Sequence, residues 1–299
     1  MVRQAHHERI KHEQYRIKII SSATHHALIP ALLPPAVEGF CALASRNACY
    51  AYIMSDILIS EHNGYRTLHF GNEWVQGRMR ISRPAELALG YAEDMTAALL
   101  FSPPPKQIYV AGLGIGALPR WALANIGETL KKLDIVELRE EVTWLCSNSF
   151  PLPLDDKRIK LTINDAAKEI ALRPDSSFDW IWVDCYDGRG SVGALESAAF
   201  YEQAHRVLKR NGVLIANMWS SVPRYIPGVK RLAKVFGHNI MLLPSVATEN
   251  VIAIAVKSTK PLPDLESAEL RVRAKVLTKT YKLPFDRWVD RMAPVKTVV

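Results

Sequence analysis

The sequence predicts an α/β fold built around a doubly wound, mostly parallel sheet, with a small antiparallel β segment before it. Across residues 84–258, apolar strand-like runs alternate with helix-like segments, the pattern of parallel strands joined by helices. The run Gln107–Ala111 passes into alternating glycines and then into a helix-like stretch. A second apolar run, Trp180–Asp184, ends on a carboxylate. Both features are typical of strands that lead into ligand-binding loops at one edge of an open sheet.

The small β segment is predicted over residues 54–83. Asn63-Gly64 between two apolar runs is a strong hairpin signal, because both residues tolerate the positive φ of a tight turn. The expected strands are Ile57–Ser60, Tyr65–Phe70 and Trp74–Met79, the last of which contains Gln76.

The main domain is predicted over residues 84–258. It opens with a helix from Ala85 to about Phe101, which three consecutive prolines end. The expected strands are Gln107–Ala111, Leu133–Glu137, Ile159–Thr162, Trp180–Asp184, Gly212–Asn217, Ile240–Leu243 and Val251–Val256. The expected helices are Ala117–Ile126, Arg139–Ser149, Asp165–Leu172, Ser197–Leu208 and Ile226–Phe236. The closely spaced last strands suggest an antiparallel edge, the layout of the class I S-adenosylmethionine-dependent, Rossmann-like folds.

The two ends of the chain are expected to differ from the main domain. Residues 1–53 have no sustained apolar period and are predicted to be a poorly ordered extension. Residues 259–299 are predicted to be a basic, helical tail, amphipathic over 264–292, with Trp288 as an anchor. The net charge of +8 belongs to these ends, because residues 54–256 hold 22 basic and 22 acidic side chains. A nucleic-acid partner is therefore not expected.

The cysteines and the apolar stretches of the sequence indicate in which compartment the protein is expected. Four cysteines show no CxxC or CxxH spacing, which predicts reduced thiols in a cytoplasmic protein without a zinc or other metal site. The apolar stretch Ala27–Ser45 is interrupted by Pro30, Pro34 and Pro35. No uninterrupted apolar stretch reaches the roughly 20 residues that span a bilayer, so no membrane partner is expected.

Acidic residues follow three of the predicted strands. Glu137 lies 25 residues after Gly112, where a carboxylate can accept hydrogen bonds from both hydroxyls of a ribose. Asp165 follows the third strand of the main domain. It is placed either to accept from an adenine amino group or to cap the next helix, and the sequence leaves both open.

Asp184 and Asp187 bracket the loop after the fourth strand of the main domain. Two carboxylates at this spacing can hold a cationic amine and remove its proton. An alkylamine has a pKa near 10.4, so it is not nucleophilic until it is deprotonated. Asp187-Gly188 can alternatively be a polar turn. For Asp184 that alternative is weak, because a carboxylate at the end of a buried strand is costly.

Several motifs occur in an order and spacing that resemble the polyamine aminopropyltransferases, the spermidine synthases. The resemblance covers roughly residues 56–257. The motifs are Gln76, Tyr91-x-Glu93, the glycine run from Gly112 to Leu118, Glu137, Asn164-Asp165-Ala166, Val183–Asp187 and Phe200-Tyr201.

The resemblance implies a donor, decarboxylated S-adenosylmethionine, an amine acceptor such as putrescine, and a homodimer. The loop of Gly112, Gly114 and Gly116 would face the donor nucleoside, with Glu137 on the ribose and Asp165 on the adenine. Asp184 would accept the proton of the amine and Asp187 would hold the diamine. Gln76 and Tyr91 would line the acceptor side, Tyr91 within the catalytic group and Gln76 among the binding residues.

The sequence departs from the family in the glycine loop, so we predict a divergent member. Family members usually carry an acid at the position of Ile115, and many carry a polar residue at that of Ala92. Without the acid, the protein recognises the aminopropyl ammonium less well and no longer repels the carboxylate of intact S-adenosylmethionine. Two alternatives therefore remain: an S-adenosylmethionine-dependent methyltransferase, and a catalytically silent nucleoside-binding relative.

Overall fold

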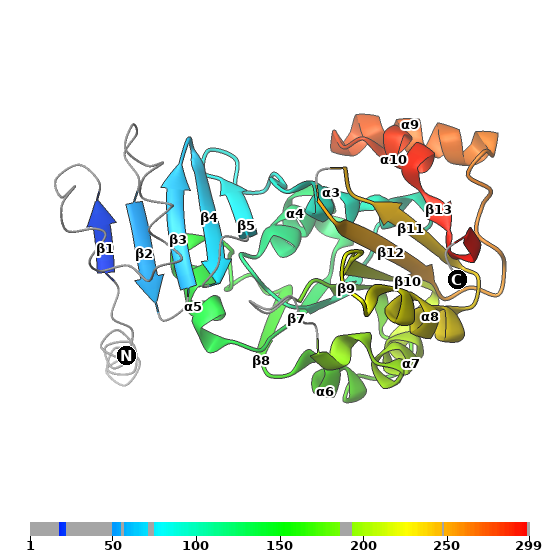
Figure 1. Cartoon of the computed structure of the whole chain (residues 1–299), viewed down its shortest axis with the longest axis horizontal. Coiled ribbons are helices and arrows are strands. Elements are labelled where there is room, and N and C mark those ends of the chain that lie inside the picture. The colour runs from blue at the N-terminus through cyan, green and yellow to red at the C-terminus, as the bar shows by residue number, and fades with distance from the viewer. Residues whose placement is uncertain are drawn as a thin grey trace. The chain divides into compact units, whose positions relative to one another are not determined.

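The structure is a computed structural model that divides into two compact units, Met1–Arg83 and Pro84–Val299 (Figure 1). It describes residues 18–21, 50–54, 57–70, 75–185, 193–246 and 248–297. The second unit holds the glycine run and the acids after the strands. It is therefore the unit in which the candidate site is built.

The smaller unit contains a five-stranded antiparallel sheet in chain order. Its strands are β1 (Lys18–Ser21), β2 (Tyr50–Met54), β3 (Ile57–His62), β4 (Tyr65–Phe70) and β5 (Val75–Arg80). The predicted turn between β3 and β4 forms, with Asn63 and Gly64 at φ of 50° and 76°. Because β1 and all of β2 except Met54 fall within residues 1–53, part of the predicted extension is strand.

The larger unit is built on an eight-stranded sheet with the order β13-β11-β12-β10-β9-β6-β7-β8. Strands β6 to β10 run parallel, whereas β12 is antiparallel to both β10 and β11. The strands are β6 (Gln107–Ala111), β7 (Lys132–Glu137), β8 (Ile159–Ile163), β9 (Phe178–Val183), β10 (Leu208–Trp219), β11 (Ile240–Pro244), β12 (Asn250–Val256) and β13 (Ala293–Pro294). The predicted doubly wound sheet with an antiparallel edge is confirmed.

Helices cover both faces of this sheet, which explains why its central strands are apolar throughout. One face packs against α6 (Ala166–Ala171), α7 (Ala198–Val207) and α8 (Tyr225–Phe236), drawn below the sheet in Figure 1. On the other face, the Trp180 indole donates to Ser102 Oγ (2.7 Å) and the Trp182 indole to the Met95 carbonyl (3.3 Å). The remaining helices between strands are α4 (Ala117–Asn125) and α5 (Glu140–Ser149), with short 3-10 turns at Gly127–Thr129 and Gly193–Glu196.

The predicted long helix over Ala85–Phe101 is wrong in length. The segment contains a short helix, α3 (Gly90–Asp94), and a 3-10 turn, η3 (Ala97–Leu100). Leu89 offers no side-chain cap to α3, and the Thr96 hydroxyl donates to the Glu93 carbonyl at 2.8 Å. Such local bonds from threonine compete with the regular helix ladder. The break leaves α3 as a separate element.

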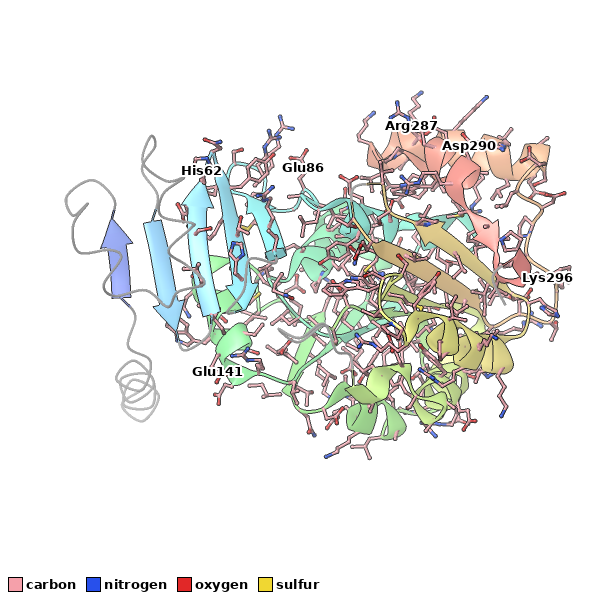
Figure 2. All side chains as sticks on the ribbon, viewed as in Figure 1. His62, Glu86, Glu141, Arg287, Asp290 and Lys296 are labelled. Atoms are coloured by element: carbon pink, nitrogen blue, oxygen red, sulfur yellow. The ribbon has the colours of Figure 1, made fainter. Side chains whose placement is uncertain are left out.

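The C-terminal segment packs within the larger unit as a helical hairpin. Its helices are α9 (Ala268–Tyr281) and α10 (Phe285–Arg291), followed by β13 and a 3-10 turn over Val295–Thr297. Trp288 is 1% exposed, so it is the anchor that the sequence predicts. Arg271 of α9 pairs with Asp290 of α10, which Figure 2 labels. Arg273 donates to the carbonyls of Leu99 (2.9 Å) and Ser102 (2.7 Å), fastening the hairpin to the segment after α3.

Within the described ranges, no helix is both long and apolar enough to cross a bilayer.

Candidate active site

The candidate site lies where the winding of the sheet changes direction, between β6 and β9. In open α/β sheets this switch point leaves a crevice beyond the carboxyl ends of the strands. Ala111 of β6 is in register with Val183 of β9, and the Asp184 N–H donates to the Ala111 carbonyl at 3.0 Å. The backbone therefore places Gly112 and Asp184 side by side.

The three glycines of the loop all have positive φ, of 92°, 51° and 70° for Gly112, Gly114 and Gly116. A Cβ on Gly112 would lie 2.4 Å from the Asp184 carbonyl oxygen, and one on Gly116 would lie 3.0 Å from Cys146 Sγ. A Cβ on Gly114 would meet no protein atom within 4 Å. The fold itself thus requires glycine at the outer two positions, whereas the space over Gly114 is left open.

Beneath the loop, apolar and cationic groups replace the acid that the resemblance leads one to expect. Ile115 is 3% exposed, and its carbonyl accepts from Arg120 Nη1 at 2.6 Å. Arg120 Nε donates to the Pro84 carbonyl at 2.9 Å. Burial lowers the pKa of the Arg120 guanidinium to about 10. The loop is thus held by a cation that is hydrogen-bonded to backbone carbonyls.

Glu137 follows β7 and fastens the same loop. Its Oε2 accepts from the Leu113 N–H (2.8 Å) and its Oε1 from the Arg139 N–H (2.9 Å). Burial raises the pKa of the Glu137 carboxyl, and the backbone hydrogen bonds act in the opposite direction. A carboxylate offers about four acceptor positions, so acceptor capacity remains for hydroxyl groups of a ligand.

Asp165 is the N-cap of α6, and its Oδ1 accepts from the Ala167 N–H at 2.8 Å. This is one of the two roles that the sequence left open. The cap occupies one of the two carboxylate oxygens.

Asp184 is a half-buried carboxylate held by two side chains. Its Oδ1 accepts from Asn217 Nδ2 at 3.0 Å, and its Oδ2 faces the Tyr91 hydroxyl at the longer distance of 3.5 Å. Burial raises the pKa of Asp184, while both hydrogen bonds lower it. Among the residues that the structure describes, no lysine, arginine or histidine pairs with this carboxylate. The site therefore provides negative charge without a matching cation.

Tyr91 is positioned by α3, which the C-terminal hairpin stabilises. Asp94 of α3 is 3% exposed, accepts from the Ser245 hydroxyl and pairs with Arg291 of α10 at 2.9 Å. Burial raises the pKa of Asp94, and Ser245 and Arg291 oppose the rise. A five-residue helix has little stability of its own, so these contacts fix where Tyr91 lies.

The structure brings some of the predicted residues together, whereas others lie in the smaller unit or outside the described residues. Tyr91, Asp184 and the glycine loop share the edge at the switch point. Gln76 is on β5 in the smaller unit, and Asp187 lies outside the described residues. Asn217 is not among the residues predicted from the sequence, although an amide that ends the apolar run of a central strand is a usable signal. The described residues contain no group of three or more histidine, cysteine or acidic side chains arranged to hold a metal ion.

Comparison with known proteins identifies the family. The family model of the spermine/spermidine synthase domain matches residues 89–266, more than half of the chain. The polyamine aminopropyltransferase of Chromobacterium violaceum is 31% identical over 239 residues, 80% of this chain and 90% of that protein. That of Neisseria meningitidis serogroup A is 30% identical over 233 residues, 78% of this chain and 87% of that protein.

The chain belongs to the spermine/spermidine synthase family. Solved structures agree on the fold. A probable spermidine synthase from Corynebacterium glutamicum superposes with a TM-score of 0.63 at 19% identity, covering 80% of this chain and 91% of that one. Human methyltransferase-like protein 13 in complex with SAH superposes with a TM-score of 0.57 at 22% identity, covering 66% of this chain and 94% of that one. The fold of this chain is thus shared with a probable spermidine synthase and with a methyltransferase-like protein.

Proposed function

We propose that this protein transfers an aminopropyl group from decarboxylated S-adenosylmethionine to a diamine such as putrescine. The observation that carries the proposal is the Asp184 carboxylate, which stands at the switch point without a cationic partner among the described residues. A protonated amine is the ligand that such a carboxylate binds best. Family membership and the names of the curated relatives support the same reaction.

The donor side of the proposal rests on the loop after β6. The open space over Gly114 leaves room for a nucleoside to approach the backbone. Glu137 keeps acceptor capacity for the ribose hydroxyls, and we propose that the second oxygen of Asp165 accepts from the adenine amino group. A solved spermidine synthase in complex with the transition-state analogue AdoDATO shares this fold, with a TM-score of 0.53.

The reaction needs a deprotonated amine close to an activated carbon. In the proposed step, Asp184 accepts a proton from the acceptor ammonium, and the freed lone pair attacks the carbon next to the sulfonium. The new N–C bond forms as the C–S bond breaks, and its electron pair stays on sulfur as a neutral thioether. Because the sulfonium is already a good leaving group, the protein contributes mainly proton removal and alignment.

The remaining predicted residues take roles on the acceptor side. We propose that Tyr91 borders the amine, since its hydroxyl faces Asp184 Oδ2. For Asp187 and Gln76 the proposed contacts with the diamine rest on the family resemblance. Asp187→Asn and Gln76→Leu are each expected to raise the KM for the amine and to leave nucleoside affinity unchanged.

A second candidate function is methyl transfer from intact S-adenosylmethionine. The observation that favours it is Ile115, whose buried, apolar side chain supplies no negative charge to repel a carboxylate. The Arg120 cation under the same loop further reduces the negative potential there.

One pair of measurements separates the candidates. Calorimetry on the purified protein compares methylthioadenosine, the product of aminopropyl transfer, with S-adenosylhomocysteine, the product of methyl transfer. Tighter binding of methylthioadenosine, together with spermidine formation from decarboxylated S-adenosylmethionine and putrescine, is the expected result. Tighter binding of S-adenosylhomocysteine without spermidine would favour methyl transfer. Binding of neither nucleoside would contradict both.

The assembly and the compartment belong to the same proposal. Family resemblance supports a homodimer, which sedimentation equilibrium of the purified chain would test. Cys146 and Cys185 are free thiols, which is consistent with a reducing, cytoplasmic setting.

A further inference from the structure

We propose that Asn217 and Asn250 form a positioning relay that holds Asp184 Oδ1 as a hydrogen-bond acceptor and leaves proton transfer to Oδ2. This inference deepens the proposed function and rests on it for the identity of the reaction. The relay joins the ends of three neighbouring strands, β9, β10 and β12, and lies within one unit of the chain. We call Asp184, Asn217 and Asn250 the carboxylate relay.

The hydrogen bonds of the carboxylate relay run in one direction, from Asn250 to Asn217 and from Asn217 to Asp184. An ionised carboxylate can only accept, so Asn217 must present its Nδ2 to Asp184, at 3.0 Å. The Asn217 Oδ1 then points the other way and needs a donor. Asn250 supplies that donor through its Nδ2 at 2.8 Å. Each link fixes the next, so the order of donors along the relay matches an ionised Asp184.

The two amides of the relay are both buried. Asn217 is 5% exposed and Asn250 is 8% exposed, and each lies in a buried stretch, 212–218 of β10 and Asn250–Val256 of β12, whose other residues are apolar. Burying an amide side chain costs free energy unless its polar atoms are hydrogen-bonded. The antiparallel register places Asn250 opposite Trp219 and Asn217 opposite Ile252, so the two asparagines are diagonal neighbours across β10 and β12. The amides therefore serve each other and the carboxylate.

The two carboxylate oxygens of Asp184 have different partners. Oδ1 is held by a buried amide at ordinary hydrogen-bond distance, whereas Oδ2 faces the Tyr91 hydroxyl at 3.5 Å, beyond a normal O–H···O bond. A ligand amine competes more easily for Oδ2 than for Oδ1. The geometry therefore assigns proton acceptance to Oδ2 and the positioning role to Oδ1.

The described part of the chain places few other titratable groups around the relay. Tyr91 faces Asp184 from α3, and Cys185 follows it in the chain. Glu137 and Asp165 act on Cys185, whose thiol pKa is raised mainly by burial. Among the described residues none of these is a cation, so burial raises the pKa of Asp184 and the hydrogen bond from Asn217 is the main influence that opposes the rise.

Three variants of the full-length protein test the relay. Asn217→Leu has nearly the same shape and removes the donor to Asp184. Asn250→Asp replaces the donor to Asn217 by an acceptor, which favours rotation of the Asn217 amide and turns its oxygen toward the carboxylate. The matched control is Asn239→Asp. Asn239 donates to the Ser258 carbonyl at 2.6 Å at the opposite end of β12, so the control makes the same chemical change outside the site.

The decisive readout is the pKa of Asp184, measured by carbon NMR on protein labelled at the aspartate carboxyls, with Asp184→Asn identifying the signal. We expect Asn217→Leu to raise this pKa by roughly one pH unit, as lost hydrogen bonds to charged groups do. The acid limb of the kcat profile should move by the same amount, while methylthioadenosine affinity stays within about twofold. Asn250→Asp should change both in the same direction, and Asn239→Asp should change neither.

The outcomes separate the relay from the proposed function, because the NMR titration needs no turnover. An unchanged Asp184 pKa in folded Asn217→Leu and Asn250→Asp overturns the relay, even if the wild-type protein makes spermidine. A raised pKa supports the relay, even if decarboxylated S-adenosylmethionine proves not to be the donor. If Asn217→Leu does not fold, Asn217→Ala, which removes the same donor without adding a charge near Asp184, is titrated in its place and decides in the same way.

Discussion

Two carboxylates of the larger unit, the buried Asp134 and the half-buried Asp184, have opposite surroundings. Asp134 is fully buried on β7 and receives both Nε (3.1 Å) and Nη2 (2.9 Å) of Arg173. Lys132 lies 2.9 Å from the same carboxylate, and Arg173 also pairs with Glu169 at 2.8 Å. Asp184, by contrast, is held by an amide and a distant hydroxyl.

The comparison teaches how to distinguish a structural charge from a functional one. Around Asp134 the protein supplies the countercharges, so the group joins β7 to α6 and has little left to offer a ligand. Around Asp184 the cost of burial is not offset by a cation among the described residues, and the pKa is raised as a result. Such uncompensated groups mark positions where a substrate completes the charge balance.

The largest expected effect is on activity, which should depend on Asp184 and not on Asp134. Asp184→Asn should lower kcat for aminopropyl transfer by at least about 100-fold, because the amine loses its proton acceptor. Methylthioadenosine affinity, measured by calorimetry, should stay nearly constant. Asp134→Asn, the same chemical change at the structural carboxylate, should keep kcat within a few-fold at a temperature where it is folded. Equal loss in both variants would contradict the distinction.

The same two variants should move stability in opposite directions. Asp134→Asn should lower the free energy of unfolding by about 3 kcal/mol, since it removes one partner from a buried ion-pair cluster. Asp184→Asn should raise it by roughly 0.5 to 2 kcal/mol, because an uncompensated charge is removed from a functional site. Urea unfolding at pH 7 measures both. A loss of stability in Asp184→Asn would show that its charge is compensated after all.

The pH dependence sharpens the comparison further. The native pKa of Asp184 is raised above the ordinary 3.8, so the native state keeps this proton to higher pH than the unfolded chain does. The associated stability is present at low pH and is lost as pH rises through the native pKa. The stability advantage of Asp184→Asn should therefore be smallest near pH 3.8 and should grow as pH rises, in paired urea titrations. A constant difference would contradict the raised pKa.

A last pair of variants applies the same reasoning to two glycines of the loop. Gly112→Ala places a Cβ against the backbone of Asp184 and should cost at least about 2 kcal/mol of stability. Gly114→Ala meets no protein atom within 4 Å and should cost about 1 kcal/mol, from its positive φ alone. It should nevertheless weaken methylthioadenosine binding by about tenfold. Thermal unfolding measures the loss of stability in each variant, and calorimetry measures the affinity for methylthioadenosine. Unchanged nucleoside affinity in Gly114→Ala would mean that the open space serves no ligand.

Much of the fold follows from local sequence signals. The glycine run after Gln107–Ala111 and the acid after Trp180–Val183 identify the two strands that meet at the switch point, and the structure pairs them. The hairpin at Asn63-Gly64 follows from turn chemistry in the same way. These signals are local, because a strand's burial and a turn's φ depend on a few adjacent residues.

The features that the sequence did not reveal depend on distant contacts. The break between α3 and η3 depends on what Asp94 and Thr96 bond to, and Arg291 lies 197 residues away from Asp94. Asn217 became meaningful only when strand order put it beside Asp184 and Asn250. For residues 259–299, the sequence predicts a helical tail anchored by Trp288 but not which elements of the larger unit it contacts. Their apolar face looks the same in sequence whether it meets solvent or the core.

The short strand at the end of the chain affects how the sheet can grow. β13 covers part of β11, with Leu242 opposite Ala293 and Met241 opposite Pro294. Exposed strand edges invite pairing with other chains, and a proline has no N–H with which to extend a ladder. The last residues therefore cap this side of the sheet against edge-to-edge aggregation. Removing residues 293–297 would expose this edge and also take the fully buried Val295 out of the core, so the shortened protein should be less stable and prone to precipitation.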